Sequence, residues 1–516
     1  CIIPVGGGKD SYYQTHYVMK ELGMKPLLVT YHGNNYMDVG ERNLQKMRKV
    51  FDADHIVFRP SEKMLKKINF KIIGMALVLA ILTTNCKSSA SFGKGDSLLV
   101  LKQDQFKHYV DYFNTMEDEN IKEAIPNDSA WVWMKNAIPF FECPQQNFEE
   151  IYYFRWWSAR KHIKKTPQGY AISEFMVQRS YADKYNMISS ALGHHITEFK
   201  WLRDPNYLQQ NIRLWYRGQD GKPLKKLRNF SSWNASALYT AYLVNKDEQF
   251  LLDIFPDLVQ EYAAWEGDRR RKDGLFWQFD VKDGMEESLS GARKFRNARP
   301  TINSYMFGNA QALSKIAELK GDVRSATLFK QKADTLQQLV QTKLWNADDM
   351  FFETFTEKDT IAKVREAIGF IPWYFNLPQK EKGFEKAWEQ LKDEKGFSAP
   401  FGLTTAERRS PRFRTHGTGT CEWDGAIWPF ATSQTLTAMA NLLNNYTQSY
   451  VDKTDYFKQL SLYVESQYYR GKPYVGEYLD ETTGYWLMGD RERSRYYNHS
   501  TFNDLIITGL MGVRPR

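Results

Sequence analysis

The chain has 516 residues, of which 42% are hydrophobic and 25% are charged, a composition that excludes a disordered protein. This length allows one large helical barrel or two to three average domains. The net charge is +9, but Lys and Arg are spread along the chain without a long basic arm, so nucleic acid is not expected as a partner. Aromatic residues make up 15%, which suits either a carbohydrate-binding pocket or a large core.

The four cysteines, Cys1, Cys86, Cys143 and Cys421, show none of the spacings of a metal site, so we expect no zinc and no cofactor. Cys143 and Cys421 either pair in an oxidising compartment or stay as buried thiols. A calcium site stays open as an alternative, because scattered carboxylates can assemble one that sequence spacing does not reveal.

The first 63 residues read as the start of an α/β domain. A short apolar strand at Cys1–Val5 is followed by a glycine-rich turn, a helix around Tyr12–Leu22 and a second strand at Pro26–Tyr31. A turn of this kind gathers backbone N–H groups into an anion site, and a lysine there can hold a phosphate. The predicted phosphate-binding residues are Gly7, Gly8, Lys9, Asp10 and Ser11.

This turn resembles the PP-loop motif SGGKDS, and its surroundings resemble the N-acetyl sugar amidotransferases of surface-polysaccharide synthesis. Gly6 stands where the motif has serine, which removes a phosphate-facing hydroxyl. The resemblance ends near Lys63, before the elements that would complete a nucleotide site. The site is therefore interpreted as vestigial, and an ATP-dependent sugar amidotransferase is the least favoured of the functions considered.

Residues 64–86 have the layout of a secretory signal peptide, with a basic start at Lys66 and Lys67 and an apolar run from Ile72 to Leu82. The segment ends at Cys86 and resembles a bacterial lipoprotein signal, which implies lipidation of Cys86 and a membrane anchor. The alternative is a buried core helix.

These two N-terminal segments together indicate a junction. We hypothesise that residues 1–63 are a fragment of a cytoplasmic enzyme, joined by gene fusion or sequence assembly to an exported protein that starts at Met64. Residues 87–104 then form a tether and residues 105–516 the main domain. The expected location is that of a membrane-anchored lipoprotein, in the periplasm or on the outer-membrane surface.

In the main domain, apolar residues recur mostly at helical spacing, and no GxGxxG motif or alternation of strand and helix occurs. About twelve helices paired in sequence predict an all-α fold, an (α/α)6 toroid of six hairpins. In such a ring, connections that are distant in sequence meet at one end of the axis. The predicted helices are Phe148–Lys164, Asn186–Leu202, Tyr207–Tyr216, Asn234–Asn245, Gln249–Trp265, Ile302–Lys320, Val323–Leu344, Lys363–Tyr374, Glu381–Lys395, Gly425–Asn445, Thr454–Tyr469 and Thr501–Leu510.

The connection Leu275–Tyr305 concentrates acidic and aromatic side chains. Its carboxylates are interleaved with Phe276, Trp277, Phe279 and Met285, and an apolar wall raises the pKa of a carboxyl group toward that of a general acid. An acidic surface turn with aromatic neighbours is the alternative. Two later connections share this mixture of glycine, aromatic and acidic residues, at 416–429 and 475–486.

Three motifs in these connections carry a resemblance. The motif Gly284-Met285-Glu286 is similar to G-[MW]-D, Trp423-Asp424-Gly425-Ala426-Ile427-Trp428-Pro429 to W-x-G-P-x-W-P, and Glu477-Tyr478-Leu479-Asp480-Glu481-Thr482-Thr483-Gly484 to E-x-Y-[ND]-P-x-T-G. In this order, on an all-helical chain, they resemble the (α/α)6-barrel glycoside hydrolases of family 63 and the mannosylglycerate-hydrolase-like enzymes. The resemblance covers about residues 142–516.

The resemblance implies a glycosidase that acts on a carbohydrate substrate by inversion, with Glu286 as general acid and Glu477 as general base. Asp283 is close enough in sequence to be the acid instead. Trp277, Trp423 and Trp428 are candidate platforms for a sugar ring, and Arg299, Asn303 and Asp424 are candidate contacts for its hydroxyl groups. In the alternative interpretation, Trp428 packs under the following helix and Glu477 is a surface acid.

A second hypothesis is a carbohydrate-binding lipoprotein that keeps the aromatic cleft without hydrolysis. It predicts sugar binding that is unaffected by Glu286→Gln and no turnover of any glycoside. The sequence leaves open the sugar, its linkage and anomeric form, and the oligomeric state.

Overall fold

The structure is a computed structural model that describes residues 2–4, 9–21, 23–31, 46–47, 49–58, 101–291, 293–415 and 421–515. The chain forms two compact units, residues 1–98 and 99–516. The predicted signal peptide with Cys86, most of the tether, and Gly7 and Gly8 lie outside the described residues. Within these ranges, no helix combines the length and the apolar character needed to cross a membrane.

The smaller unit contains a parallel three-stranded sheet. Strand β1 (Ile2–Pro4) pairs with β2 (Leu27–Tyr31), and β2 pairs with β3 (His55–Phe58). Helix α1 (Lys9–His16) and a π-helical turn connect β1 to β2, because parallel neighbours need a crossover. The predicted strand–helix–strand order is therefore confirmed, and β3 is an addition that the sequence reading missed. Phosphate binding by this turn stays a prediction.

The larger unit is all-α, as predicted, and each helix expected after residue 147 is found, some with shifted ends. Its α-helices are α4 (Lys107–Asn114), α5 (Ala130–Ala137), α6 (Gln146–Arg160), α7 (Leu192–Phe199), α8 (Asn206–Arg217), α9 (Asn234–Asn245), α10 (Glu248–Arg269), α11 (Pro300–Lys320), α12 (Val323–Lys343), α13 (Ile371–Tyr374), α14 (Pro429–Asn445) and α15 (Lys453–Ser466). The segment predicted at Glu381–Lys395 is a 3-10 helix, η8 (Phe384–Leu391), and the last helix is a π-helix, η10 (Leu505–Leu510).

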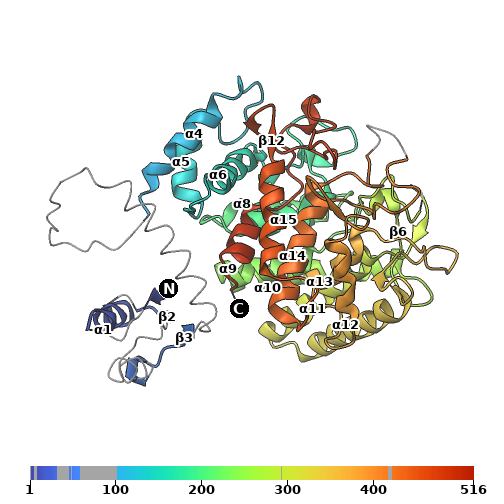
Figure 1. Ribbon diagram of the computed structural model, residues 1–516, viewed down its shortest axis with the longest axis horizontal. Helices are drawn as coiled ribbons and strands as arrows, with labels where there is room; N and C mark the ends of the chain where they lie inside the picture. The colour runs from blue at the N-terminus through green and yellow to red at the C-terminus, as the bar shows by residue number, and fades with distance from the viewer. Residues whose placement is uncertain are drawn as a thin grey trace, which may run out of the picture. The chain divides into compact units, whose positions relative to one another are not determined.

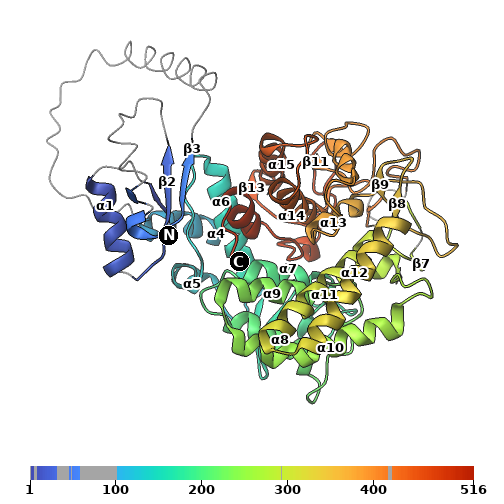
Figure 2. The same ribbon diagram turned by 90° about the horizontal axis from the view of Figure 1, so that it is seen from below.

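These helices alternate between an inner and an outer ring. Helices α7, α9, α11, α13, α14 and η10 contact one another in that order, and Figures 1 and 2 show outer helix α12 beside inner helix α11. Burial follows this division: all eight residues of α7 are buried, whereas α12 buries only one stripe. The stripe consists of Ala326, Phe329, Ala333, Leu336 and Val340. The arrangement is that of the expected (α/α)6 toroid.

The ring closes where the first inner helix meets the last one. The Glu198 carboxylate accepts hydrogen bonds from the backbone N–H groups of Phe502, Asn503 and Asp504 at 2.8–3.3 Å. A carboxylate is stabilised there by the unsatisfied N–H groups and the dipole of a helix N-terminus. Lys200 adds an ion pair of 2.9 Å to Asp504, so two buried side chains of the α7 region hold η10 in place.

Short antiparallel hairpins, which the sequence reading did not predict, shape the connections between helices. Their strands are β4 (Ile163–Thr166), β5 (Gly169–Ile172), β6 (Gln278–Phe279), β7 (Arg296–Asn297), β8 (Trp345–Asn346), β9 (Phe351–Phe352), β10 (Ser398–Ala399), β11 (Gly402–Leu403), β12 (Tyr468–Tyr469) and β13 (Lys472–Pro473). The hairpins give the long connections hydrogen-bonded backbones, so the side chains between the strands have fixed positions.

Candidate active site

Acidic side chains from three distant connections gather at one end of the inner ring. Glu286 lies between α10 and α11, Glu477 follows β13, and Glu174 follows β5. Burial is the largest cause that raises the pKa of Glu174 to about 7, and the negative charges of Glu477 and Glu286 raise it further. Burial also raises the pKa of Cys421, in the connection before α14, and the same two charges raise it further. The predicted acid and base are therefore neighbours across the ring.

Glu286 has the environment of a proton donor. Burial raises the pKa of its carboxyl group to about 7, its own backbone N–H opposes this shift, and the charge of Glu477 adds to it. The residue keeps part of its surface exposed, and it forms no ion pair among the described residues. A carboxyl group of this kind is protonated often enough near neutral pH to donate a proton.

Glu477 is more buried, at 4% exposed, but it lies next to positive charge. Its Oε2 atom is 3.1 Å from Nη2 of Arg493. Burial raises the pKa of the Glu477 carboxyl group, and the positive charges of Arg493, Arg491 and Arg179 oppose that rise. Arginine charges favour the ionised form, which is the form that a general base requires.

The segment that carries Glu477 is held by backbone pairing over an apolar cluster. Leu479 exchanges two hydrogen bonds of 3.0 Å with Ile427, which precedes α14. Leu479 is fully buried, and it packs with Ile427, Tyr474 and Trp486. Leu479, which stands at the Tyr position of the motif, is therefore part of a packed core. This pairing also joins the second and third motifs of the sequence.

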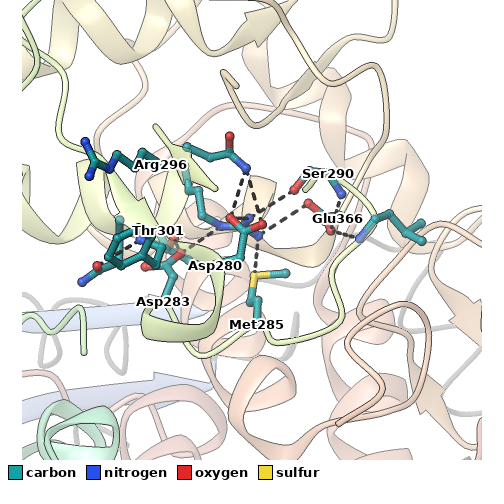
Figure 3. Close-up of polar contacts among 12 residues, drawn as sticks. Asp280, Asp283, Met285, Ser290, Arg296, Thr301 and Glu366 are labelled. Atoms are coloured by element: carbon teal, nitrogen blue, oxygen red, sulfur yellow. Dashed lines mark hydrogen bonds and ion pairs between the residues drawn. The ribbon is translucent and has the colours of Figure 1, made fainter. Parts of the chain in front are cut away.

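A buried charge cluster supports the connection that carries Glu286. The fully buried Arg299 guanidinium contacts carboxylates of Asp280 at 2.8 Å, Asp283 at 3.1 Å and Glu366 at 3.7 Å. Figure 3 shows these acids converging beside Met285. Thr301 donates a hydrogen bond to Asp283, and Glu366 accepts the backbone N–H of Leu289 at 2.8 Å.

This cluster changes the roles expected for two residues. Arg299 has no exposed surface from which to contact a sugar hydroxyl, so its predicted substrate contact is not supported. The carboxylate of Asp283 forms an ion pair with Arg299 and accepts a hydrogen bond from Thr301, and these contacts disfavour Asp283 as the catalytic acid. Gly291 belongs to the same support, because a Cβ atom there would lie 2.1 Å from an oxygen of Asp280.

Asn303 and Trp277 also lie apart from the acid and base. The fully buried Asn303 amide accepts the N–H of Phe276 at 2.8 Å and donates to the carbonyl groups of Phe276 and Arg299 at 2.9 Å. It therefore fastens the connection to α11 instead of facing a ligand. Trp277 borders an open surface groove whose lining includes neither Glu286 nor Glu477, and the guanidinium of Arg296 lies 5.0 Å from its ring. A sugar platform at the reaction centre is not supported for Trp277.

Two of the predicted tryptophans form a stack with Tyr478. The ring centroids of Trp423 and Trp428 are 4.4 Å apart, and those of Trp428 and Tyr478 are 4.6 Å apart. Trp428 is therefore covered on both faces and donates its N–H to the carbonyl group of Glu422 at 3.1 Å, which supports its structural alternative. Trp423 ends the stack, so the stack covers only one of its faces, and 4% of its surface is exposed. The neighbouring Asp424 is fully buried.

Glu174 is the site residue that the sequence reading missed. Its carboxylate accepts hydrogen bonds from the hydroxyl group of Ser190 at 2.7 Å and from that of Tyr497. No local motif marks it, since it stands alone after a β-hairpin. Only the closure of the ring brings it close to the charges of Glu286 and Glu477.

The segment 496–500 carries Tyr497, whose hydroxyl group contacts Glu174. Its alternate carbonyl groups, at Tyr496, Asn498 and Ser500, accept hydrogen bonds from His162 at 2.7 Å, His195 at 2.7 Å and Arg155 at 2.6 Å. Burial lowers the pKa of His162 to about 3 and that of His195 to about 4, so both histidines are neutral donors.

Neither a metal site nor a disulfide occurs among the residues that the structure describes. No group of three or more His, Cys, Asp or Glu side chains there is arranged to hold a metal ion. His195 and Glu198 of α7 form hydrogen bonds with the backbone of Asn498 and Asn503. Cys143 and Cys421 are free thiols.

Comparisons with known proteins agree with this fold. A solved structure named "Sialidase" is 63% identical, with a TM-score of 0.80, over 81% of this chain and 38% of its own. The mannosylglycerate hydrolase of family GH63 from Thermus thermophilus has a TM-score of 0.54 at 12% identity, over 69% of this chain and 99% of its own, which supports the fold. An uncharacterized protein of Borreliella burgdorferi is 20% identical over 36% of this chain and 38% of its own.

The chain thus spans little more than a third of the length of two of these relatives. Residues 184–500, more than half of the chain, match the family described as the mannosylglycerate hydrolase MGH1-like glycoside hydrolase domain. The expected fold and the expected class of enzyme, a glycosidase, are confirmed at the level of the family. The chain belongs to the MGH1-like glycoside hydrolases.

Proposed function

We propose that this protein hydrolyses a glycoside with inversion at the anomeric carbon, with Glu286 as general acid and Glu477 as general base. The observation that carries the proposal is the contrast between two neighbouring carboxyl groups. The pKa of Glu286 is raised to about 7, and Glu477 has a guanidinium 3.1 Å away. A carboxyl group with a raised pKa beside a second one that contacts a guanidinium is an arrangement that suits acid–base catalysis.

In the proposed reaction, Glu286 transfers its proton to the glycosidic oxygen as the bond from that oxygen to the anomeric carbon breaks. Glu477 removes a proton from a water molecule, whose oxygen forms the new bond on the opposite face of the sugar. The sugar leaves with inverted configuration, Glu286 is left ionised and Glu477 is left protonated. Proton exchange with solvent restores both groups.

Two further residues are proposed to position the sugar. Trp423, at the end of the aromatic stack, offers a ring against which a sugar face can pack. Glu174 can accept a hydrogen bond from a sugar hydroxyl, because its carboxylate lies beside both catalytic candidates and is itself oriented by Ser190 and Tyr497.

The proposed function is tested by following the first-formed product with proton NMR. A panel of glycosides is screened first. It includes mannosylglycerate and sialylated glycosides, because two similar proteins are named as a mannosylglycerate hydrolase and a sialidase. The expected product carries the anomeric configuration opposite to that of the substrate. Retention of configuration would contradict the mechanism, and binding without turnover across the panel would favour the carbohydrate-binding alternative.

The matched variants are Glu477→Gln and Glu465→Gln, where Glu465 is an exposed residue of α15. We expect Glu477→Gln to lower kcat/KM by about 10²- to 10⁴-fold, the range for loss of general acid–base catalysis. Glu465→Gln should leave it unchanged. Added azide should restore turnover of an activated substrate by Glu477→Gln, because a small anion needs no base, and should give the inverted glycosyl azide.

We also propose that the protein is exported and lipidated at Cys86, with residues 1–63 absent from the mature form. The sequence pattern of residues 64–86 supports this proposal. Metabolic labelling with an alkyne-tagged fatty acid should mark the native protein and fail to mark Cys86→Ser. Detection of a Gly6–Ser11 peptide in the mature protein by mass spectrometry would contradict the proposed start.

A further inference from the structure

A cavity lies on the axis of the ring. It has a volume of about 340 Å³ and is lined by all six inner helices or the residues next to them. This cavity, called the axial cavity below, shares none of its lining residues with the candidate active site. Its lining includes Thr197, Lys200, Trp201, Trp233, Ser236, Tyr239, Thr240, Gln311, Lys315, Tyr374, Thr437, Asn441, Asp504 and Arg514.

Aromatic rings separate the axial cavity from the catalytic end. Trp233 lines the cavity, and its ring lies 4.9 Å from that of His194. His194 contacts Phe430 at 4.4 Å between centroids, and Phe430 contacts Trp423 at 5.9 Å. The two sites are therefore distinct, and they are joined by a continuous series of ring contacts.

The charged side chains at the floor of the cavity contact other protein groups. Lys200 pairs with Asp504 at 2.9 Å, and both side chains are less than one tenth exposed. Trp201 donates its indole N–H to the same carboxylate at 2.8 Å. Arg514 donates to the carbonyl group of Thr508 and to the amide of Asn441, and Lys315 is exposed at the rim. The buried charged side chains of the floor are thus all held by partners within the protein.

The walls combine aromatic faces with uncharged polar groups. Trp201, Tyr239 and Tyr374 are each partly exposed, and hydroxyl and amide side chains lie between them. The buried indole N–H of Trp233 makes no well-aligned hydrogen bond among the described residues, although the Tyr374 hydroxyl is close. A buried donor without a partner costs free energy unless a ligand or water accepts from it.

We propose that the axial cavity is a second binding site, for an uncharged monosaccharide. Aromatic faces pack against the C–H faces of a sugar ring, and uncharged polar groups bind its hydroxyls. The volume is within the range of small-molecule sites and suits one sugar ring. This site is independent of the catalytic assignment, since it uses neither Glu286 nor Glu477.

The test uses the full chain labelled with 6-fluorotryptophan, observed by fluorine NMR. The Trp201 signal is assigned by its loss in Trp201→Phe, and D-glucose, D-galactose and D-mannose are then titrated up to about 100 mM, a range that covers weak binding. We expect at least one sugar to shift the Trp201 signal with saturation. D-glucuronate, a charged analogue, should shift it less.

Thr240→Phe fills the cavity and should abolish the Trp201 shift, whereas Thr335→Phe on exposed α12 should retain it. If Thr240→Phe does not fold, Ser236→Leu takes its place. A Trp201 signal that is unchanged by all three sugars would overturn the proposal, and so would a shift that survives in the filled cavity. Preference for glucuronate would overturn the assignment to an uncharged ligand.

Discussion

The connection that carries Glu286 and the segment that carries Glu477 hold the same functional group by opposite means. The connection that carries Glu286 is supported by buried charges, those of Arg299 and its carboxylate partners. Glu286 itself forms no ion pair with the residues that the structure describes. Around Glu477 the order is reversed. Apolar residues such as Leu479 and Trp486 form the support, and arginines surround the carboxyl group.

The comparison shows how an identical side chain acquires two roles. Desolvation disfavours the charged form of each carboxyl group, and only Glu477 has a guanidinium in direct contact to oppose it. The role of each glutamate is therefore set by its surroundings more than by its position in a motif. Substitutions that exchange or remove these surroundings test this conclusion.

The largest effect is expected from Glu286→Gln, and it should depend on the leaving group. Without a proton donor, a glycoside with a poor leaving group should lose about 10²- to 10⁴-fold in kcat/KM. A glycosyl fluoride, whose leaving group needs little protonation, should lose less than about tenfold, since only the proton transfer is removed. Steady-state rates with both substrates measure the difference.

Glu477→Gln is the control, because loss of the base should slow both substrates equally. If Glu286→Gln loses the same factor in kcat/KM with both substrates, Glu286 is not the acid. Asp283→Asn completes the comparison. If the loss of kcat/KM in Asp283→Asn depends on the leaving group and the loss in Glu286→Gln does not, the proton donor is Asp283.

The next effect concerns stability. Arg299→Met leaves three buried carboxylates without their shared cation, and breaking a buried ion pair costs about 3–5 kcal/mol. Urea unfolding should show this loss in the larger unit. The loss should shrink toward about pH 5, because burial raises the pKa of Asp280 to about 6 and protonated carboxyl groups need no cation.

Arg293→Met is the matched control within the same loop. Arg293 pairs with Glu287 at 2.8 Å, but about half of its side chain is exposed, so the loss should stay below about 1 kcal/mol. Equal losses for the two arginines would contradict the supporting role of the buried cluster.

The fold of the larger unit was predictable because helical periodicity survives in its long segments. The range Asn234–Asn245 is identical in the prediction and the structure, and Val323–Leu344 differs by one residue. Short hairpins such as β6–β7 were missed, since two-residue strands carry no periodic pattern. Helix α6 was predicted to end at Lys164, and it ends at Arg160 because strand β4 begins at Ile163.

The candidate site was predictable only where a motif carried it. Glu286 and Glu477 were predicted in this way, and in the structure the charge of Glu477 acts on Glu286. Arg299 and Asn303 were misassigned, because polar residues beside a motif look alike whether they face a ligand or a buried partner. Glu174 depends on contacts between residues more than 100 positions apart, which no local pattern records.

A smaller loss of stability is expected on the side of Glu477. Leu479 is fully buried among apolar side chains, and a change from leucine to alanine in such a place costs about 2–5 kcal/mol. We expect the lower end, because Leu479 lies in a small cluster at one end of the ring. Leu328→Ala, at a residue 47% exposed on α12, should cost well under about 1 kcal/mol. A loss no larger than that of Leu328→Ala would contradict an apolar support.

The smallest effect is a shift in the pH dependence of kcat/KM. Arg493→Met removes the guanidinium next to Glu477, so the pKa of Glu477 rises and the acidic limb of the profile moves up by about one pH unit. The alkaline limb, set by Glu286 near pH 7, should stay in place. Arg491→Met should shift the acidic limb less, since Arg491 opposes the rise of that pKa less than Arg493 does. An alkaline limb that moves while the acidic limb stays would mean that the two glutamates have exchanged roles.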